Sequence, residues 1–124
     1  MNGLHLTADL GGVDPALPLM RDAEVLATLC REAVLQSGLS GVAELFHRFG
    51  AADEQSGITG VVLLAESHLA VHTWPELGCV TLDVYVCNYG ADNSGKARAL
   101  MASLSAAFGA SVVTAKELQR GGGA

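Results

Sequence analysis

A length of 124 residues, half of them hydrophobic, predicts a single domain with a core of its own. The net charge of −6 excludes the basic face of a nucleic-acid-binding domain. The seven Lys and Arg residues are scattered, which excludes a basic patch for a membrane surface, and no apolar run is long enough to span a bilayer.

The first third of the chain predicts two strands separated by a helix. Residues 4–10 alternate apolar and polar side chains, as a strand does, and a loop follows over residues 11–18. Residues 22–36 are predicted to form a helix, which the SGLSG stretch at 37–41 ends, and residues 42–49 form a second strand. The apolar stripe of this helix has helical spacing and consists of Leu26, Leu29, Cys30, Ala33 and Val34.

The middle of the chain predicts three more strands. A polar, glycine-bounded loop at residues 50–57 is expected to be flexible. Residues 58–65 are apolar throughout, which predicts a strand buried on both faces, and residues 68–74 form a strand that Pro75 stops. Residues 79–87 alternate cleanly: Val80, Leu82, Val84 and Val86 face one way, while Thr81, Asp83, Tyr85 and Cys87 face the other.

The last part of the chain predicts a helix and a final strand. The helix covers residues 94–108, begins at a cap formed by Asn93 or Ser94, and is followed by a strand over residues 110–118. Residues 121–124, GGGA, are expected to be a disordered tail. The apolar stripe of the helix consists of Leu100, Met101, Leu104 and Phe108.

The element order β-α-β-β-β-β-α-β predicts an α+β fold, a two-layer sandwich with a mostly antiparallel sheet and two helices on one face. Two layers leave the other face of the sheet uncovered, and a second copy of the chain would cover it in a homodimer. The three cysteines form no CxxC pair, and the start of the chain lacks the basic and apolar pattern of a secretion signal. These two features predict reduced thiols in the cytoplasm.

Residues 65–76, AESHLAVHTWPE, place an acid, a hydroxyl, two imidazoles and an indole beside apolar runs. His68 and His72 are four apart, but their neighbours favour a strand, on which the spacing separates them by ~13 Å and excludes a shared zinc ion. His68 is interpreted as a hydrogen-bonded polar residue of the sheet.

Ser67 raises the alternative of a hydrolase that uses His72 and Asp83. AESHL is not a GxSxG nucleophile elbow and no helix follows it, so spacing alone favours an ordinary serine. Cys87 ends a strand on its polar face, whereas Cys30 lies on a core stripe; spacing leaves Cys87 open between a functional thiol and an inert one.

The stretch Ala65–Glu76, followed by DVYVC at Asp83–Cys87, resembles the short prokaryotic S-adenosylmethionine decarboxylase proenzyme family, whose pattern reads ESH..IHTWPE.G and then VD.F.C. Gly3-Leu-His-Leu, Phe46-His-Arg-Phe49 and Gly60-Val-Val fall in the order of the family, so the resemblance covers most of the chain.

The resemblance implies a self-processing proenzyme, one domain over residues 1–124, that cuts itself between Glu66 and Ser67. Residues 1–66 would become the β chain and residues 67–124 the α chain. Ser67 would become a covalent pyruvoyl group, which replaces pyridoxal phosphate by holding the substrate amine as a Schiff base and accepting the electrons released as carbon dioxide leaves. No metal is needed.

The resemblance also assigns roles by matched position. His72 matches the histidine that moves a proton during processing, and Thr59 falls where the family often has a processing serine. Cys87 matches the acid that protonates the substrate carbon after decarboxylation. Glu76 matches the carboxylate that binds the ribose hydroxyls, and Phe49 the aromatic that stacks on adenine. Two further matched residues, His5 and Trp74, are interpreted as structural.

One geometric point conflicts with these roles, because Ser67 and His72 are five residues apart and face opposite sides of a straight strand. We therefore expect a bend or bulge near Ser67, or strain at the scissile peptide. In this family the site is built at a subunit boundary, so Phe49, Cys87 and Glu76 need not come from one protomer.

The chain departs from the family near the substrate pocket. The tyrosine after Glu76 is Leu77, the next is Cys79, and the loop after Phe49 is longer. These changes leave three alternatives open: decarboxylation of S-adenosylmethionine for spermidine biosynthesis, the same chemistry on ornithine or arginine, and a non-processing regulatory paralogue. A basic substrate would favour carboxylates in the pocket, and the sequence offers Glu44, Asp53 and Glu54.

Overall fold

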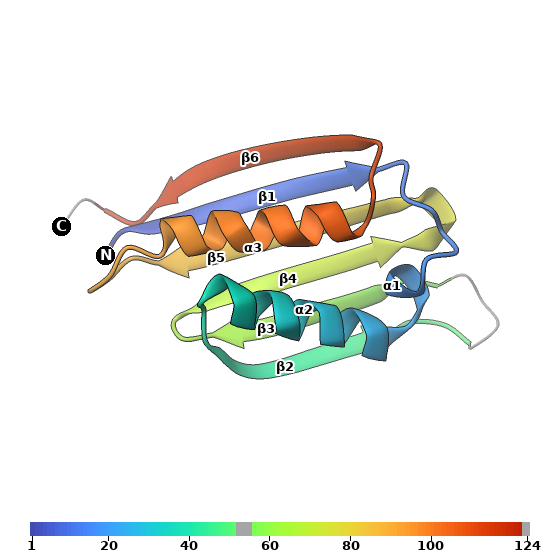
Figure 1. Cartoon of the computed structure of the whole chain (residues 1–124), viewed down its shortest axis with the longest axis horizontal. Coiled ribbons are helices and arrows are strands. Elements are labelled where there is room, and N and C mark those ends of the chain that lie inside the picture. The colour runs from blue at the N-terminus through green and yellow to red at the C-terminus, as the bar shows by residue number, and fades with distance from the viewer. Residues whose placement is uncertain (52–55, 123–124) are drawn as a thin grey trace.

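The computed structural model describes residues 1–51 and 56–122 and has one six-stranded sheet with helices on one side (Figure 1). Its elements in chain order are β1 (Gly3–Gly11), α1 (Pro18–Arg21), α2 (Ala23–Ser37), β2 (Gly41–Arg48), β3 (Ile58–Leu64), β4 (Ser67–Trp74), a 3₁₀ turn (Pro75–Leu77), β5 (Cys79–Cys87), α3 (Ser94–Ala107) and β6 (Val112–Arg120). None of the helices within the described ranges is long and apolar enough to cross a membrane.

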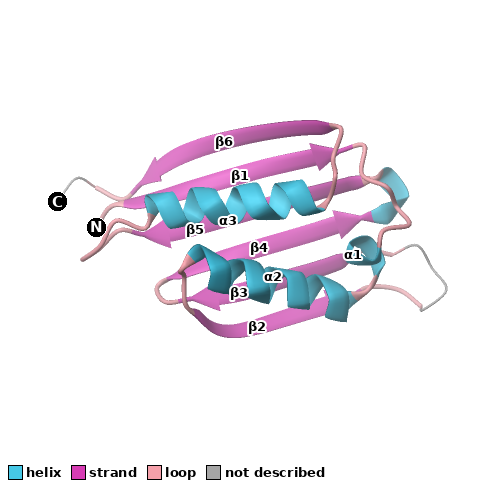
Figure 2. Cartoon of the chain, viewed as in Figure 1, coloured by secondary structure: helices cyan, strands magenta, loops and turns pink. Residues whose placement is uncertain are grey.

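The strands lie in the order β2-β3-β4-β5-β1-β6, and every pair of neighbours is antiparallel. Helix α2 covers the β2 and β3 side of the sheet and α3 covers β5 and β1, so that helices form one layer and strands the other (Figure 2). The predicted α+β two-layer sandwich with a mostly antiparallel sheet is therefore confirmed. The short helix α1 was not predicted, because four residues are too few to show a helical period.

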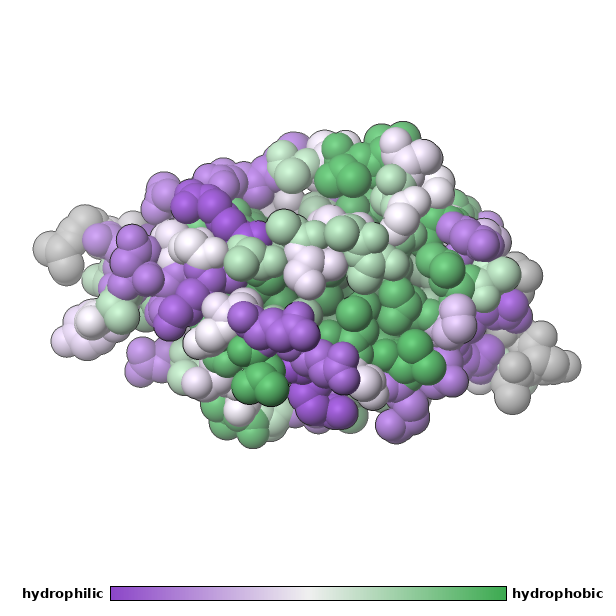
Figure 3. All heavy atoms as spheres, viewed as in Figure 1, coloured by the Kyte–Doolittle hydropathy of each residue, from purple (hydrophilic) through white to green (hydrophobic). Residues whose placement is uncertain are grey.

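The core lies between the helices and the sheet, and it is built by the alternation of the strands. In β5, Val80, Leu82, Val84 and Val86 are buried, and the intervening residues are half-buried. The predicted helix stripes face them, with Leu26, Cys30 and Leu104 fully buried. Burying a Leu or Val contributes ~1.5–3 kcal/mol. Seen from the helix side, hydrophobic surface lies in the middle, between the helices, while hydrophilic residues dominate the ends (Figure 3).

The other side of the sheet, here called the open face, is not covered by any helix or strand within residues 1–51 and 56–122. Its apolar residues are correspondingly exposed: Leu45 is 74% exposed, Leu63 49% and Leu118 58%. The prediction that the strand at 58–65 is buried on both faces is wrong, because only the face of β3 that carries Val62 and Leu64 meets the helices.

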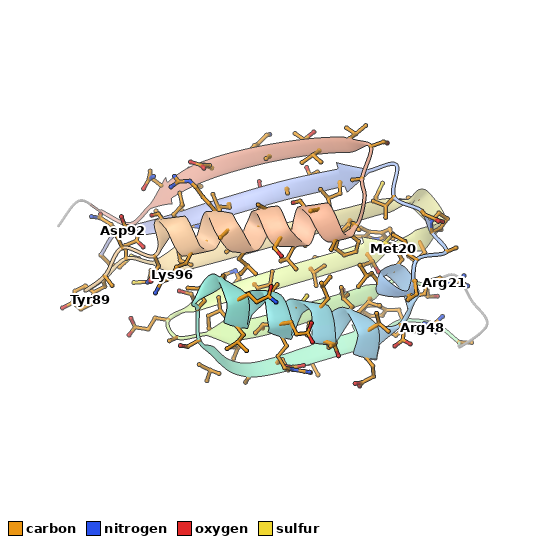
Figure 4. The ribbon with its side chains drawn as sticks, viewed as in Figure 1. Met20, Arg21, Arg48, Tyr89, Asp92 and Lys96 are labelled. Atoms are coloured by element: carbon orange, nitrogen blue, oxygen red, sulfur yellow. The ribbon has the colours of Figure 1, made fainter. Side chains whose placement is uncertain are left out.

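Two carbonyl groups of α1 tie the ends of two strands together. The Thr73 hydroxyl donates to the Met20 carbonyl at 2.9 Å, and Arg48 Nε donates to the Arg21 carbonyl at 2.9 Å. Figure 4 labels Arg48 beside Met20 and Arg21 at this end of the sheet. The Thr73 hydroxyl also accepts from the Ile58 N–H at 3.0 Å, so this threonine, 2% exposed, is fully hydrogen-bonded.

Of three local predictions, the cap of α3 is confirmed in position but not in its hydrogen bond, and the other two are not tested. Asn93 occupies the N-cap of α3, but its side chain makes no capping bond; the Asp92 carboxylate accepts from the Ser94 N–H at 3.0 Å instead. That hydrogen bond holds the pKa of Asp92 below its ordinary value. The expected flexible loop at 50–57 and the expected disordered tail at 121–124 lie partly outside the described residues.

Candidate active site

The Glu66–Ser67 peptide lies in the tight hairpin between β3 and β4. Leu64 pairs with Ser67, so Ala65 and Glu66 alone make the turn, and the Ala65 N–H donates to the Ser40 carbonyl at 3.1 Å. Glu66 has φ +56°, the one positive φ of a non-glycine residue in the described ranges. Such a conformation costs ~1–2 kcal/mol for an L residue. The peptide bond after Glu66 therefore follows directly on a strained residue.

Ser67 and Cys87 lie side by side on neighbouring strands. The Cys87 N–H donates to Ser67 Oγ at 3.0 Å, and the Tyr89 N–H donates to Cys87 Sγ at 3.4 Å. The Asn93 amide donates to the Cys87 carbonyl at 2.9 Å, which fixes the end of β5. Backbone groups thus hold both the hydroxyl and the thiol, and two of the three predicted catalytic residues, Ser67 and Cys87, belong to one cluster, here called the serine end.

A second cluster lies at the other end of β4. Thr59 is directly opposite His72 in the β3–β4 pairing, and Thr59 Oγ1 lies 3.0 Å from His72 Nδ1. The Trp74 indole stacks on the His72 ring, with centroids 5.7 Å apart and an angle of 22° between the planes. We call this cluster the histidine end.

A pocket of about 330 Å³ opens at the histidine end. Four of the predicted site residues line it, namely Phe49, Thr59, His72 and Glu76. Phe49 directly follows β2 and is 51% exposed; its ring meets the edge of the His47 ring with centroids 4.6 Å apart. Glu76 lies in the 3₁₀ turn after Trp74. The pocket therefore combines an aromatic face, a carboxylate, a hydroxyl and an imidazole.

The two clusters do not meet within one chain. Ser67 and His72 lie at opposite ends of β4, separated by roughly 16 Å at ~3.3 Å per residue, and their side chains face opposite sides. Of the two expectations, a bend or bulge is absent from β4 itself, which pairs in continuous register from Ser67 to Trp74. The positive φ at Glu66 instead agrees with the expected strain at the scissile peptide.

The same separation removes the serine hydrolase alternative within a single chain. Ser67 does not reach His72, and Asp83 bonds another histidine, with His5 Nε2 3.1 Å from Asp83 Oδ1. Arg120 donates to His5 Nδ1 at 3.3 Å, so Nε2 carries the proton that His5 donates to the carboxylate. No group of three or more metal-ligating side chains occurs within residues 1–51 and 56–122.

His68 lies on the open face against other rings rather than in a hydrogen bond. Its centroid is 5.7 Å from that of Tyr85 and 6.3 Å from that of His5. His68 was predicted to be hydrogen-bonded, and this prediction is wrong, because the contacts of its ring are with other rings. This aromatic cluster could not be predicted, because its members come from three strands and the hydrophobic periodicity of a strand does not determine which strands are neighbours in the sheet.

The carboxylates proposed for a basic substrate do not gather at the pocket. Arg31 binds Glu44 through two hydrogen bonds of 2.8 Å on the helix side, and this partner holds the pKa of the Glu44 carboxyl below its ordinary value. Asp53 and Glu54 lie outside the described residues. Cys30 is buried in the core, which raises the pKa of its thiol to about 12 and leaves it protonated.

Comparisons with known proteins agree on one family. The family model described as S-adenosylmethionine decarboxylase matches residues 4–121. A relative from Symbiobacterium thermophilum named S-adenosylmethionine decarboxylase proenzyme is 38% identical over 122 residues, which cover 98% of this chain and 85% of the relative. A protein of the same name from Picrophilus torridus is 40% identical over 85 residues, covering 68% of this chain and 61% of that relative.

The fold has a solved counterpart as well. The crystal structure of the adenosylmethionine decarboxylase from Aquifex aeolicus matches with a TM-score of 0.83 and 34% sequence identity. The match covers 96% of this chain and 90% of that one.

Proposed function

Because the chain belongs to the S-adenosylmethionine decarboxylase family, we propose that it is a self-processing, pyruvoyl-dependent decarboxylase of S-adenosylmethionine. The observation that carries the proposal is the serine end. A strained Glu66 precedes Ser67, whose hydroxyl is held by the Cys87 N–H. Residues 1–66 form the β chain after cleavage and residues 67–124 the α chain.

Cleavage uses side chains of the protein and one water molecule. The Ser67 hydroxyl attacks the Glu66 carbonyl carbon; a C–O bond forms, the C–N bond breaks, and the hydroxyl proton passes to the released nitrogen. Loss of the Ser67 α proton then expels the Glu66 carboxylate and leaves a dehydroalanine. Water hydrolyses this residue to the pyruvoyl group and ammonia. Relief of the positive φ at Glu66 favours the first step.

The proton transfers use His72, which lies at the opposite end of β4 from the Ser67 of its own chain. A two-fold axis that lies between two open faces and runs across β4 places the histidine end of one copy over the serine end of the other. Two sheets packed in this way lie ~10 Å apart, within reach of side chains from both. Such a homodimer of processed protomers also buries Leu45, Leu63 and Leu118. Strand alternation alone would turn Ser67 away from the open face, but Ser67 is the first residue of β4 and its Oγ turns toward the backbone of the neighbouring strand, where the Cys87 N–H binds it. Each active site then combines the Glu66–Ser67 peptide and Cys87 of one protomer with Thr59 and His72 of its partner.

The residues present fit the group and its substrate. The pyruvoyl group supplies a carbonyl that withdraws electrons from the substrate carbon as carbon dioxide leaves. The Cys87 thiol returns a proton to that carbon. Across the dimer, Phe49 stacks on the adenine and the Glu76 carboxylate accepts hydrogen bonds from the ribose hydroxyls. Thr59 fixes one ring nitrogen of His72, which leaves the other for proton transfer.

We propose that the product, decarboxylated S-adenosylmethionine, serves as an aminopropyl donor for spermidine biosynthesis in the cytoplasm. The pairing of Glu44 with Arg31 weighs against ornithine or arginine as substrate, since that carboxylate is already neutralised on the helix side.

Intact-mass spectrometry together with carbon dioxide release tests the proposal. We expect two fragments, divided between Glu66 and Ser67, with an α chain blocked to N-terminal sequencing, and release of labelled carbon dioxide from S-adenosylmethionine. A stable full-length mass would identify a non-processing paralogue. Cleavage with activity on ornithine or arginine alone would overturn the substrate assignment and leave the processing assignment intact.

A further inference from the structure

Hydrogen bonds and burial anchor the end of β4 on both sides of Trp74. Thr73, buried against α1, binds both the Met20 carbonyl and the Ile58 N–H. Pro75 is buried and starts the 3₁₀ turn directly after Trp74. The backbone on both sides of Trp74 is therefore fixed, although the indole itself lies on the open face and is 37% exposed.

Trp74 meets one side chain in a defined geometry. It lies two residues after His72 on the same face of β4, and the two rings stack with an angle of 22° between the planes and 5.7 Å between the centroids. Thr59 holds the edge of the same imidazole through Nδ1 at 3.0 Å. In the described part of the chain, His72 Nε2 has no hydrogen-bond partner.

These two contacts restrain different motions of the imidazole. A hydrogen bond to one nitrogen fixes an edge but allows the ring to swing about that bond, and the terminal torsion of histidine is broad. A stacked ring on the face removes that swing. Together the two contacts define which nitrogen faces Thr59 and which is left for proton transfer.

We propose that Trp74 is a positioning residue for self-cleavage, which acts by holding the His72 ring in the orientation that presents Nε2 to the Ser67 region of the partner protomer. This inference rests on the proposed function. In a purely structural role, Trp74 would only fill space between two sheets, and any apolar side chain of similar size could replace it. In the positioning role, the aromatic face is required.

Variants at position 74 separate the two roles. Trp74→Phe keeps an aromatic face, whereas Trp74→Leu keeps apolar volume without one. Leu77→Ala, which truncates an exposed side chain three residues away, is the matched control. The precursor is made by cell-free translation, and its disappearance is followed by intact-mass spectrometry.

We expect Trp74→Leu to slow cleavage roughly 3- to 10-fold, the factor that an aromatic pair contributes. Trp74→Phe and Leu77→Ala should cleave at close to the wild-type rate. Equal cleavage rates for Trp74→Leu and Trp74→Phe would overturn the proposal. Failure of the wild-type chain to cleave would instead refute the proposed function, so the two failures are distinguishable.

A spectroscopic measurement reads the positioning directly, without cleavage. In a Ser67→Ala background, long-range ¹⁵N–¹H spectra of His72 report which ring nitrogen carries the proton. We expect one tautomer with Trp74 or Phe at position 74, and a mixture with Leu. A single unchanged tautomer in all three would contradict the proposal. If Trp74→Leu does not fold, Trp74→Met takes its place with the same expectations.

Discussion

The two ends of β4 hold their functional groups in different ways. At the serine end, backbone N–H groups bind the Ser67 hydroxyl and the Cys87 thiol, and the turn itself carries the strain at Glu66. At the histidine end, side chains hold side chains: Thr59 and Trp74 restrain His72 beside a pocket. Under the proposed mechanism, one end has the bond that is cleaved, and the other has the proton carrier and the substrate surface. A single chain then contains both halves of the proposed chemistry but not one complete site.

Removing the nucleophile at the serine end gives the largest expected effect. Ser67→Ala should abolish cleavage, because alanine has no oxygen to attack the Glu66 carbonyl, and intact-mass spectrometry should show a single uncut chain. Ser103→Ala, on the exposed side of α3, should cut normally. Two fragments from Ser67→Ala would show that the scissile bond or the nucleophile lies elsewhere.

Removing the Cys87 thiol, also at the serine end, should affect substrate turnover but not self-cleavage. Cys87→Ala should still cleave, because the Cys87 N–H that binds Ser67 Oγ remains. Its decarboxylation rate should fall by about 10²- to 10⁴-fold, the range for loss of a general acid. Cys79→Ala, the matched thiol at the other end of β5, should retain activity, measured as carbon dioxide release. An unchanged rate in Cys87→Ala would remove the thiol from the mechanism.

A change beneath the histidine end should affect stability. Thr73→Val keeps the shape of the side chain but leaves the Met20 carbonyl and the Ile58 N–H without their buried partner. We expect a loss of about 1–3 kcal/mol in the free energy of unfolding, measured in urea. Thr114→Val, on the exposed edge strand β6, is the control and should change stability little. A stable Thr73→Val protein would mean that α1 does not anchor β4.

The smallest effect is expected away from both ends, at the Arg31–Glu44 pair. Glu44→Gln should leave cleavage and turnover unchanged and lower stability at neutral pH by about 0.5 kcal/mol or less, as for exposed pairs. The pKa of Glu44 is lowered in the folded chain, so its contribution is complete above the unfolded value of ~4.3 and disappears as pH falls through the lower folded value. Urea unfolding at several pH values checks this. A fall in turnover would instead place Glu44 in the substrate pocket.

Local sequence signals predicted most of the fold. The clean alternation of residues 79–87 became β5, and the helix stripes at 22–36 and 94–108 face the core. The double burial expected of β3 failed because an apolar run does not reveal whether a second layer covers it within the same chain. Open-face residues such as Leu63 look like core residues in sequence and are exposed only because a single chain has two layers.

The site was harder to predict because its arrangement depends on strand pairing. The motif predicted catalytic roles for Ser67, His72 and Cys87. The five-residue spacing predicted that Ser67 and His72 would face opposite sides of a regular strand. That spacing does not distinguish a bent strand from a regular strand preceded by a strained residue, so both were expected, and the structure has the second, with the positive φ at Glu66. Trp74 stacks on His72 because residues two apart share a face of β4. The sequence predicts that the two rings are on one face, but it does not show whether the indole contacts His72 or packs against other side chains.

Mixed dimers test most directly whether the two ends of β4 act across a subunit boundary. Ser67→Ala and His72→Ala chains, distinguished by mass, are synthesised together in equal amounts. Each alone has a defective site, but in a mixed dimer the intact Ser67 of one chain faces the intact His72 of the other. We predict cleavage of the His72→Ala chain alone, in about half of its copies if the two chains associate at random. Mixed dimers in which neither chain is cut, while wild-type chains cut normally, would contradict the composite site.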